Sequence, residues 1–104
     1  MDYFEQTVYW LMAGSKGASN RLRIIEVLEK KPMNLNELSK KVNLNYKTVQ
    51  HHIDLLIENN LLVKMGNKYG QVYFLSEQMR EKQGLFKKLL DTSKLEENEK
   101  NGEK

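Results

Sequence analysis

Residues 45–51 read Asn-Tyr-Lys-Thr-Val-Gln-His, and six of the seven side chains can donate or accept a hydrogen bond. On a helix, Lys47 and Gln50 would point to one side, while Val49 and Ile53 would point to the other. A glutamine amide can pair with adenine through two hydrogen bonds, and a lysine can reach the acceptor atoms of guanine. The chemistry of this stretch indicates the reading of base edges in a DNA groove.

The predicted DNA-contacting residues lie on this helix and on a basic segment that follows it. They are Asn45, Tyr46, Lys47, Thr48, Gln50, His51, Lys64 and Lys68. Gln50 and Lys47 are the candidates for base contacts, and Tyr46 is expected at a phosphate or a thymine methyl group. For each lysine and for His51, the alternative is an ordinary solvated side chain, because sequence does not give the docking angle.

The adjacent pair His51-His52 raises the question of a metal site. Neighbouring residues on a helix point about 100° apart, so the two rings cannot easily hold one ion. The chain also has no cysteine to supply a thiolate ligand. We therefore expect no metal and no cofactor, with His52 in the core making one hydrogen bond and His51 exposed.

No arrangement of residues in the sequence predicts catalysis. There is no cysteine nucleophile, no Ser/His/Asp spacing on a matching scaffold and no carboxylate pair in an apolar setting. The segment 14–20 is too short and wrongly spaced for a phosphate loop, so we expect a connector. Its neighbourhood supplies Lys16, Arg21 and Arg23, which could reach a DNA backbone. We expect that the protein is not an enzyme.

The elements that would position these residues can be predicted from apolar spacing and capping residues. Helices are expected over 3–12, 20–31, from 34 onward, and 46–58, with Pro32 ending the second. Asn20 or Ser19 is expected to cap the second helix. Asn34 and Glu37 have the spacing of a capping box, and Asn45 is expected to cap the fourth helix through the amide of residue 47 or 48.

The residues after this helix predict a β-hairpin. Segments 61–65 and 71–75 are rich in strand-favouring residues, and segment 66–70 between them is bounded by glycines. Lys64 and Lys68 would lie at or near the tip. Two strands alone are marginally stable, so a third short strand is expected at about residues 33–34. Ser76 could then cap a last helix.

These elements predict one domain over residues 1–92, of mainly α class with a small β-hairpin (α+β), and a winged helix-turn-helix architecture. Its core is expected over 14–76, followed by a disordered charged tail at 93–104. The terminal helices 2–13 and 77–92 are candidates for dimerisation. The first helix carries two apolar stripes, which fit either burial in its own core or a subunit interface.

Charge distribution supports a nucleic-acid partner. The 104-residue chain has a net charge of +3, and residues 14–75 hold ten Lys or Arg against five acids. Basic side chains there could neutralise phosphates, which is the sequence-independent part of DNA affinity. No apolar run approaches the roughly 20 residues of a membrane span, and the N-terminus lacks the pattern of a secretory signal. We expect a cytoplasmic location.

The motif series resembles the ArsR-type winged helix-turn-helix regulators, and especially their archaeal members, over about residues 12–79. The segments that carry the resemblance are Arg21–Leu28, Leu35–Leu38, Tyr46–Leu56, Asn60–Val63 and Gly70–Ser76. The resemblance implies a homodimer joined by terminal helices, one recognition helix per half-site and a wing over the flanking backbone. Metal-sensing members carry cysteine pairs or His/Asp sites, which this chain lacks.

The leading hypothesis is a sequence-specific regulator of transcription that binds double-stranded DNA, more often a repressor on this scaffold. Helix 46–58 would lie in the major groove, with the wing 61–75 on the flanking backbone. One alternative is a protein-docking module, which should expose aromatic residues or leucines on that helix, where only Tyr46 does so. Another alternative is an architectural protein, which would show little preference among sequences. An effector ligand is unknown.

Overall fold

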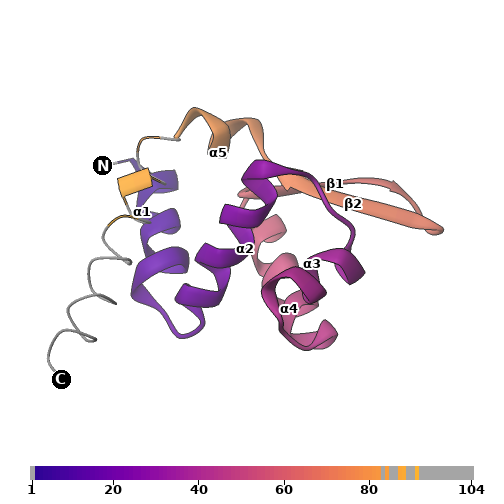
Figure 1. Ribbon diagram of the computed structural model, residues 1–104. Coiled ribbons are helices and arrows are strands. Elements are labelled where there is room, and N and C mark those ends of the chain that lie inside the picture. The colour runs from indigo at the N-terminus through magenta and orange to yellow at the C-terminus, as the bar shows by residue number, and fades with distance from the viewer. Residues whose placement is uncertain (1, 83, 85–86, 89–90, 92–104) are drawn as a thin grey trace, which may run out of the picture.

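The computed structural model describes residues 2–82, 84, 87, 88 and 91, and Figure 1 shows the arrangement of the elements. Within these residues the chain forms helices and one hairpin. The elements are α1 (Tyr3–Tyr9), the π-helix η1 (Trp10–Gly14), α2 (Ala18–Lys30), α3 (Leu35–Val42), α4 (Tyr46–Glu58), β1 (Leu62–Asn67), β2 (Gly70–Leu75) and α5 (Glu77–Glu81). This is the element order of a winged helix-turn-helix, as the sequence predicted.

One apolar core joins the helices to the base of the hairpin. Fully buried side chains come from α2, α3, α4 and the start of β1, among them Ile25, Leu38, Ile53 and Leu62. The first helix contributes to the same core through Phe4, Val8, Leu11 and Met12. The other stripe of that helix remains outside, since Tyr3 and Trp10 are 84% and 62% exposed.

The helix-turn-helix is fixed by local capping bonds. The Asn34 side chain accepts a hydrogen bond from the Glu37 amide at 2.8 Å, and the Glu37 carboxylate accepts one from the Asn34 amide at 3.3 Å. Asn45 accepts from the Lys47 amide at 2.8 Å. The predicted capping box and the predicted cap of α4 are confirmed, together with the bounds of α4. These caps set the angle at which α4 leaves the turn.

The predicted start of α2 is wrong. The helix begins at Ala18 after Gly17, which has a left-handed φ of 86°, so neither Ser19 nor Asn20 is the cap and the connector is only residues 15–17. A Cβ atom at Gly17 would lie 2.9 Å from a side-chain atom of both Arg21 and His52. The close approach of the Arg21 and His52 side chains leaves room only for glycine at residue 17. Gly17 therefore occupies the N-cap position, and α2 starts at Ala18 instead of the predicted residue 20.

The first helix also runs further than predicted, because it continues as the π-helix η1 to Gly14. A π-turn moves the backbone hydrogen bonds to i→i+5 and releases carbonyl groups from the α-helical pattern. Two carbonyls of this region accept hydrogen bonds from side chains: Trp10 O accepts from Ser15 Oγ at 2.7 Å, and Leu11 O accepts from Arg21 Nε at 2.6 Å.

The predicted wing is confirmed, and it is tighter than expected. The strands pair antiparallel from Leu62↔Leu75 to Asn67↔Gly70, so the loop is only residues 68–69. Gly66 has a φ of 120°, and a Cβ there would collide with the carbonyl of Gly70. Met33 pairs with Tyr73 on the other side of β2 as an isolated β-bridge, so the third short strand predicted at about residues 33–34 is reduced to this single pair.

The Ser76 hydroxyl caps α5 by accepting from the Met79 amide at 3.0 Å, as predicted. The apolar stripe expected for the rest of this helix, at residues 85, 86, 89 and 90, lies outside the described residues, as does the tail predicted at 93–104. Among the residues that the structure describes, no helix has the length and apolar character needed to cross a membrane.

Candidate nucleic-acid interface

Helix α4 presents a polar face because its apolar residues are used by the core. Val49, Ile53 and Leu56 are fully buried, and their i, i+4, i+7 spacing places them on one side. The opposite side exposes Tyr46, Lys47, Thr48 and His51, with Tyr46 54% exposed. The structure therefore leaves these four predicted contact residues accessible to a partner, whereas Asn45 uses its side chain to cap the helix.

Gln50 is the predicted base-reading residue, and its amide is already oriented. Its Nε2 donates a hydrogen bond to Asp54 Oδ1 at 2.8 Å, one helical turn further along. An amide carries two N–H donors and one carbonyl acceptor, and the Gln50 amide also interacts by hydrogen bonding with the phenol of Tyr73. The hydrogen bond to Asp54 thus restricts the orientation of the half-buried Gln50 side chain before a partner binds.

A groove brings the start of α4 and the wing tip together. It has a volume of about 370 Å³, and its lining residues come from the starts of α3 and α4 and from the hairpin. They are Asn34, Leu35, Asn36, Tyr46, Gln50, Lys68, Tyr69, Gly70, Gln71 and Tyr73. Of the predicted contact residues, this groove collects Tyr46, Gln50 and Lys68. Lys64 is not part of it, since it is exposed in the middle of β1 opposite Tyr73.

Sequence reasoning missed Tyr69 as a member of this surface. Tyr69 is 86% exposed at the wing tip, and Lys68 Nζ lies 5.1 Å from the centre of its ring, within the range of a cation–π contact. The signal that could have found it is an aromatic residue beside a lysine in a glycine-bounded hairpin loop. Asn34, Asn36 and Gln71 add polar groups to the groove that were also not predicted.

The expectation that Arg21 could reach a DNA backbone is wrong. Arg21 is 3% exposed, and its guanidinium group is surrounded by neutral acceptors. Nε donates to Leu11 O at 2.6 Å, and Nη2 donates to Ser15 Oγ at 2.6 Å and to Lys16 O at 3.0 Å. Nη1 lies 3.3 Å from His52 Nδ1. The carbonyl groups released at the end of the first helix draw this arginine inward, and its burial lowers its pKa.

His52 is confirmed as a core histidine, at 6% exposure, and His51 is exposed. Because a guanidinium group can only donate, His52 Nδ1 must accept from Arg21, which places the proton of the neutral ring on Nε2. Burial lowers the pKa of His52, and the charge of Arg21 and the neighbouring His51 add to this effect. His52 therefore lies on the buried side of α4 in its neutral form.

Tyr73 supports the same helix from the wing. It is 5% exposed, and burial together with nearby Asp54 and Tyr46 raises the pKa of its phenol. Over the ranges that the structure describes, no three or more His, Cys, Asp or Glu side chains are grouped as metal ligands. The arrangement provides hydrogen-bonding and cationic groups over a groove, which is a recognition surface.

Comparison with known protein families finds a match for the central part of the chain. Residues 18–64, which run from α2 into β1, match the model described as "Bacterial regulatory protein, arsR family". This segment is similar to the helix-turn-helix domains of that family. No curated protein sequence matches the chain. The ArsR resemblance expected from the motifs is confirmed for this segment.

Solved structures show the same fold at low sequence identity. Reduced HlyU from Vibrio cholerae is 18% identical with a TM-score of 0.62, covering 88% of this chain and 87% of that chain. The homodimeric winged helix-turn-helix domain of Mb0332 from Mycobacterium bovis is 15% identical with a TM-score of 0.66, covering 84% and 79%. NolR from Sinorhizobium fredii is 19% identical with a TM-score of 0.62, covering 82% and 83%.

These similarities establish that the chain has a winged helix-turn-helix fold. Neither the family description nor the three structures supports the archaeal affinity expected from the motifs.

Proposed function

We propose that the protein is a transcriptional regulator that binds double-stranded DNA in a sequence-specific manner. The observation that carries this proposal is the groove in which Tyr46 and Gln50 of α4 meet Lys68 and Tyr69 of the wing tip. An amide that can pair with a base edge and a cation that can neutralise a phosphate therefore line one groove. The ArsR-family match of residues 18–64 supports the same function.

In the proposed complex, the exposed face of α4 enters the major groove. Lys47 and Gln50 read base edges there, because lysine can reach guanine acceptors and the oriented Gln50 amide can pair with adenine. Thr48 and Tyr46 contact the adjacent backbone, and His51 is within the same face. Lys64 and Lys68 of the wing neutralise flanking phosphates, which adds affinity without sequence preference.

We further propose that the protein acts as a homodimer. The exposed Tyr3 and Trp10 form an apolar stripe on the first helix, which a second copy would cover. The Mycobacterium bovis neighbour is described as homodimeric. A two-fold dimer would bind a near-palindromic site with half-sites about 34 Å apart, one turn of DNA. Bound across a promoter, such a dimer would block access and repress transcription.

The testing experiment is a selection of random DNA duplexes on the full chain at two salt concentrations, followed by sequencing of the bound fraction. The proposal predicts an enriched near-palindromic motif whose binding weakens steeply with salt. Salt-dependent binding without enrichment would replace it with an architectural role. Failure to bind any duplex at low salt would contradict DNA binding by the protein alone.

A further inference from the structure

The wing is apolar on both faces, although only one face packs on the core. Leu62, Tyr73 and Leu75 point inward and are buried. The alternate residues pair across the opposite face as Val63↔Phe74 and Met65↔Val72. An antiparallel hairpin with one solvated face normally carries polar residues there.

This outer apolar face is open to solvent. Met65 is 65% exposed, Val63 is 40% exposed and Val72 is 39% exposed, while Phe74 is half-buried. The register makes the four side chains contiguous, because residues directly opposite each other in a pair lie about 5 Å apart. Contiguous exposed apolar patches often mark sites where a protein binds a partner.

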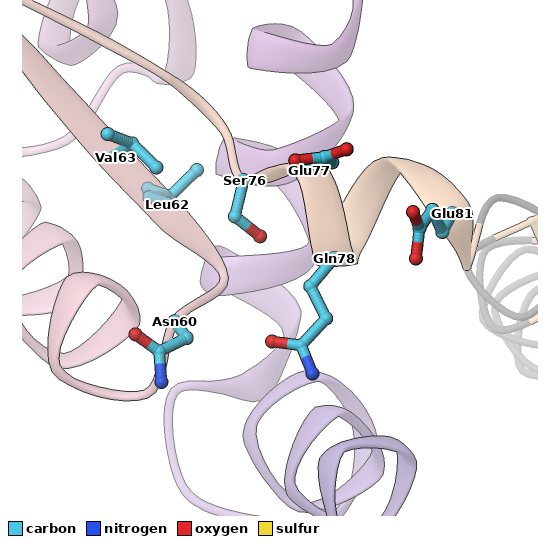
Figure 2. Close-up of a pocket in the computed structure, with 7 residues that line it drawn as sticks. All are labelled: Asn60, Leu62, Val63, Ser76, Glu77, Gln78 and Glu81. Carbon is cyan, nitrogen blue, oxygen red and sulfur yellow. The ribbon is translucent and has the colours of Figure 1, made fainter.

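An acidic groove continues from this face at the base of the hairpin. It has a volume of about 500 Å³ and is lined by Asn60, Leu62, Val63, Ser76, Glu77, Gln78 and Glu81. Figure 2 shows Leu62 and Val63 on β1 along one side, and Glu77, Gln78 and Glu81 on α5 along the other. Val63 belongs to both the outer face and the groove, so the two surfaces are continuous.

Within the residues that the structure describes, no ion pair neutralises the carboxylates of this groove. The ion pairs formed among the described residues are those of Lys82 with Asp2 and Glu5, and they involve neither Glu77 nor Glu81. An apolar surface bordered by two unpaired carboxylates attracts a partner with apolar and cationic side chains. The same carboxylates disfavour DNA, whose phosphates they would repel.

We propose that the outer face of the wing, formed by Val63, Met65, Val72 and Phe74, is a docking surface for a basic, apolar segment of another protein. Apolar side chains of that segment cover Met65 and Val72. Its Lys or Arg side chains enter the groove and pair with Glu77 and Glu81. The surface is distinct from the proposed DNA interface, so a DNA-bound molecule could hold this partner at the same time.

The test is a selection of random displayed peptides on the immobilised full chain, with counter-selection on a Met65→Ser/Val72→Ser variant. We expect the enriched peptides to combine apolar residues with Lys or Arg. A synthetic copy of one such peptide should bind about fivefold or more weaker to Met65→Ser/Val72→Ser and to Glu77→Gln/Glu81→Gln, measured by anisotropy. Its binding to the wild-type chain should weaken with salt.

Two variants serve as matched controls. Glu29→Gln removes an exposed acid on α2, and Lys47→Ala/Gln50→Ala alters the proposed DNA interface, so both should bind the peptide like the wild type. Circular dichroism melts check folding of each variant. If the Met65→Ser/Val72→Ser chain does not fold, the selection and the comparison use Glu77→Gln/Glu81→Gln, which changes exposed side chains on α5.

Three outcomes would overturn the proposal. Enrichment of acidic or uncharged peptides, or equal peptide recovery on the wild-type chain and on Met65→Ser/Val72→Ser, would contradict a basic partner at this face. A loss of dimer mass in the Met65→Ser/Val72→Ser variant would assign the face to a second copy. A loss of affinity for selected DNA in that variant would assign the face to DNA. Because peptide and DNA binding are measured separately, this proposal and the proposed function can fail independently.

Discussion

Arg21 connects three segments through a single side chain. Its bonds join the end of the first helix, the connector 15–17 and His52 on α4. Among the described residues, no carboxylate forms an ion pair with it. A buried cation is costly unless hydrogen bonds compensate it, and here carbonyl, hydroxyl and imidazole groups do so. The side chain therefore has a structural role rather than a DNA-binding role.

Replacing this arginine tests that role. Arg21→Met should lower the free energy of unfolding by about 2–4 kcal/mol, because the partner carbonyl groups lose hydrogen bonds from a charged donor. Urea denaturation measures the change. Arg23→Ala, which removes an exposed arginine two residues later, should change stability by less than about 0.5 kcal/mol. Equal effects of the two changes would contradict the assignment.

His52 should make stability depend on pH. Its pKa in the folded protein is lowered, whereas an unfolded histidine has a pKa of about 6.5. Above that value both states are neutral at this residue and it adds no pH dependence. As pH falls below about 6.5, the unfolded state takes up a proton that the folded state resists, so the free energy of unfolding decreases. The decrease is complete below the folded pKa.

Denaturation of His52→Asn from pH 7.5 to 5 provides the measurement. Asparagine keeps an acceptor near the position of Nδ1 but does not titrate, so the variant should show a weaker pH dependence. An unchanged pH dependence of stability in His52→Asn would contradict the assignment of this titration to His52.

The double change Lys47→Ala/Gln50→Ala should weaken binding to the selected DNA site by about tenfold or more, while the fold remains intact. Each lost base contact typically costs about 1–3 kcal/mol of discrimination. Anisotropy with the selected duplex and with a scrambled duplex measures the ratio. Lys30→Ala, at the exposed end of α2, should have little effect on that ratio. An unchanged ratio in the double variant would rule out base reading by these residues.

At the scale of elements, the wing should contribute affinity without sequence preference. Changing both Lys64→Ala and Lys68→Ala should weaken binding to all duplexes alike and reduce the salt slope by about 1 per lost phosphate contact. Lys68 at the tip should account for the larger part, since Lys64 lies in the middle of β1. Salt titrations of the single and double variants separate the two. A loss confined to the selected duplex would mean that the wing reads bases.

The elements of this fold could be predicted where their causes are local. The caps at Asn34 and Asn45 depend on side chains that bond amides two or three residues away, so their spacing was visible in the sequence. The hairpin was marked by its glycines and strand-favouring residues. The bounds of α4 followed from its cap and from the regular spacing of Val49, Ile53 and Leu56.

The sequence did not reveal features that depend on distant contacts. Arg21 resembles any surface arginine until the π-helix supplies a free carbonyl from Leu11. The early start of α2 follows from the close packing of Arg21 and His52 over Gly17. For the candidate site, the helix residues were predicted, but the groove required the position of the wing tip and therefore Tyr69.

At the scale of the whole molecule, the first helix contributes to the core, and its proposed role in dimerisation must be tested separately. Deleting it would expose the core, because Phe4 and Val8 are buried there. The change Tyr3→Ser/Trp10→Ser alters only the exposed stripe and should convert the proposed dimer to a monomer. Light scattering measures the mass. Tyr69→Ser, an equally exposed change at the wing tip, should leave the mass unchanged. A monomeric wild type would contradict the dimer.

The bridge between Met33 and Tyr73 has a consequence for the order in which the chain folds. Two backbone hydrogen bonds, of 3.3 Å and 2.8 Å, join residues that are 40 positions apart. Loop-closure entropy makes such a contact slower to form than the neighbouring contacts of α2, α3 and α4. During synthesis, α3 and α4 also emerge before β2. We therefore expect α4 to be assembled on α2 and α3 before the wing is anchored beside it.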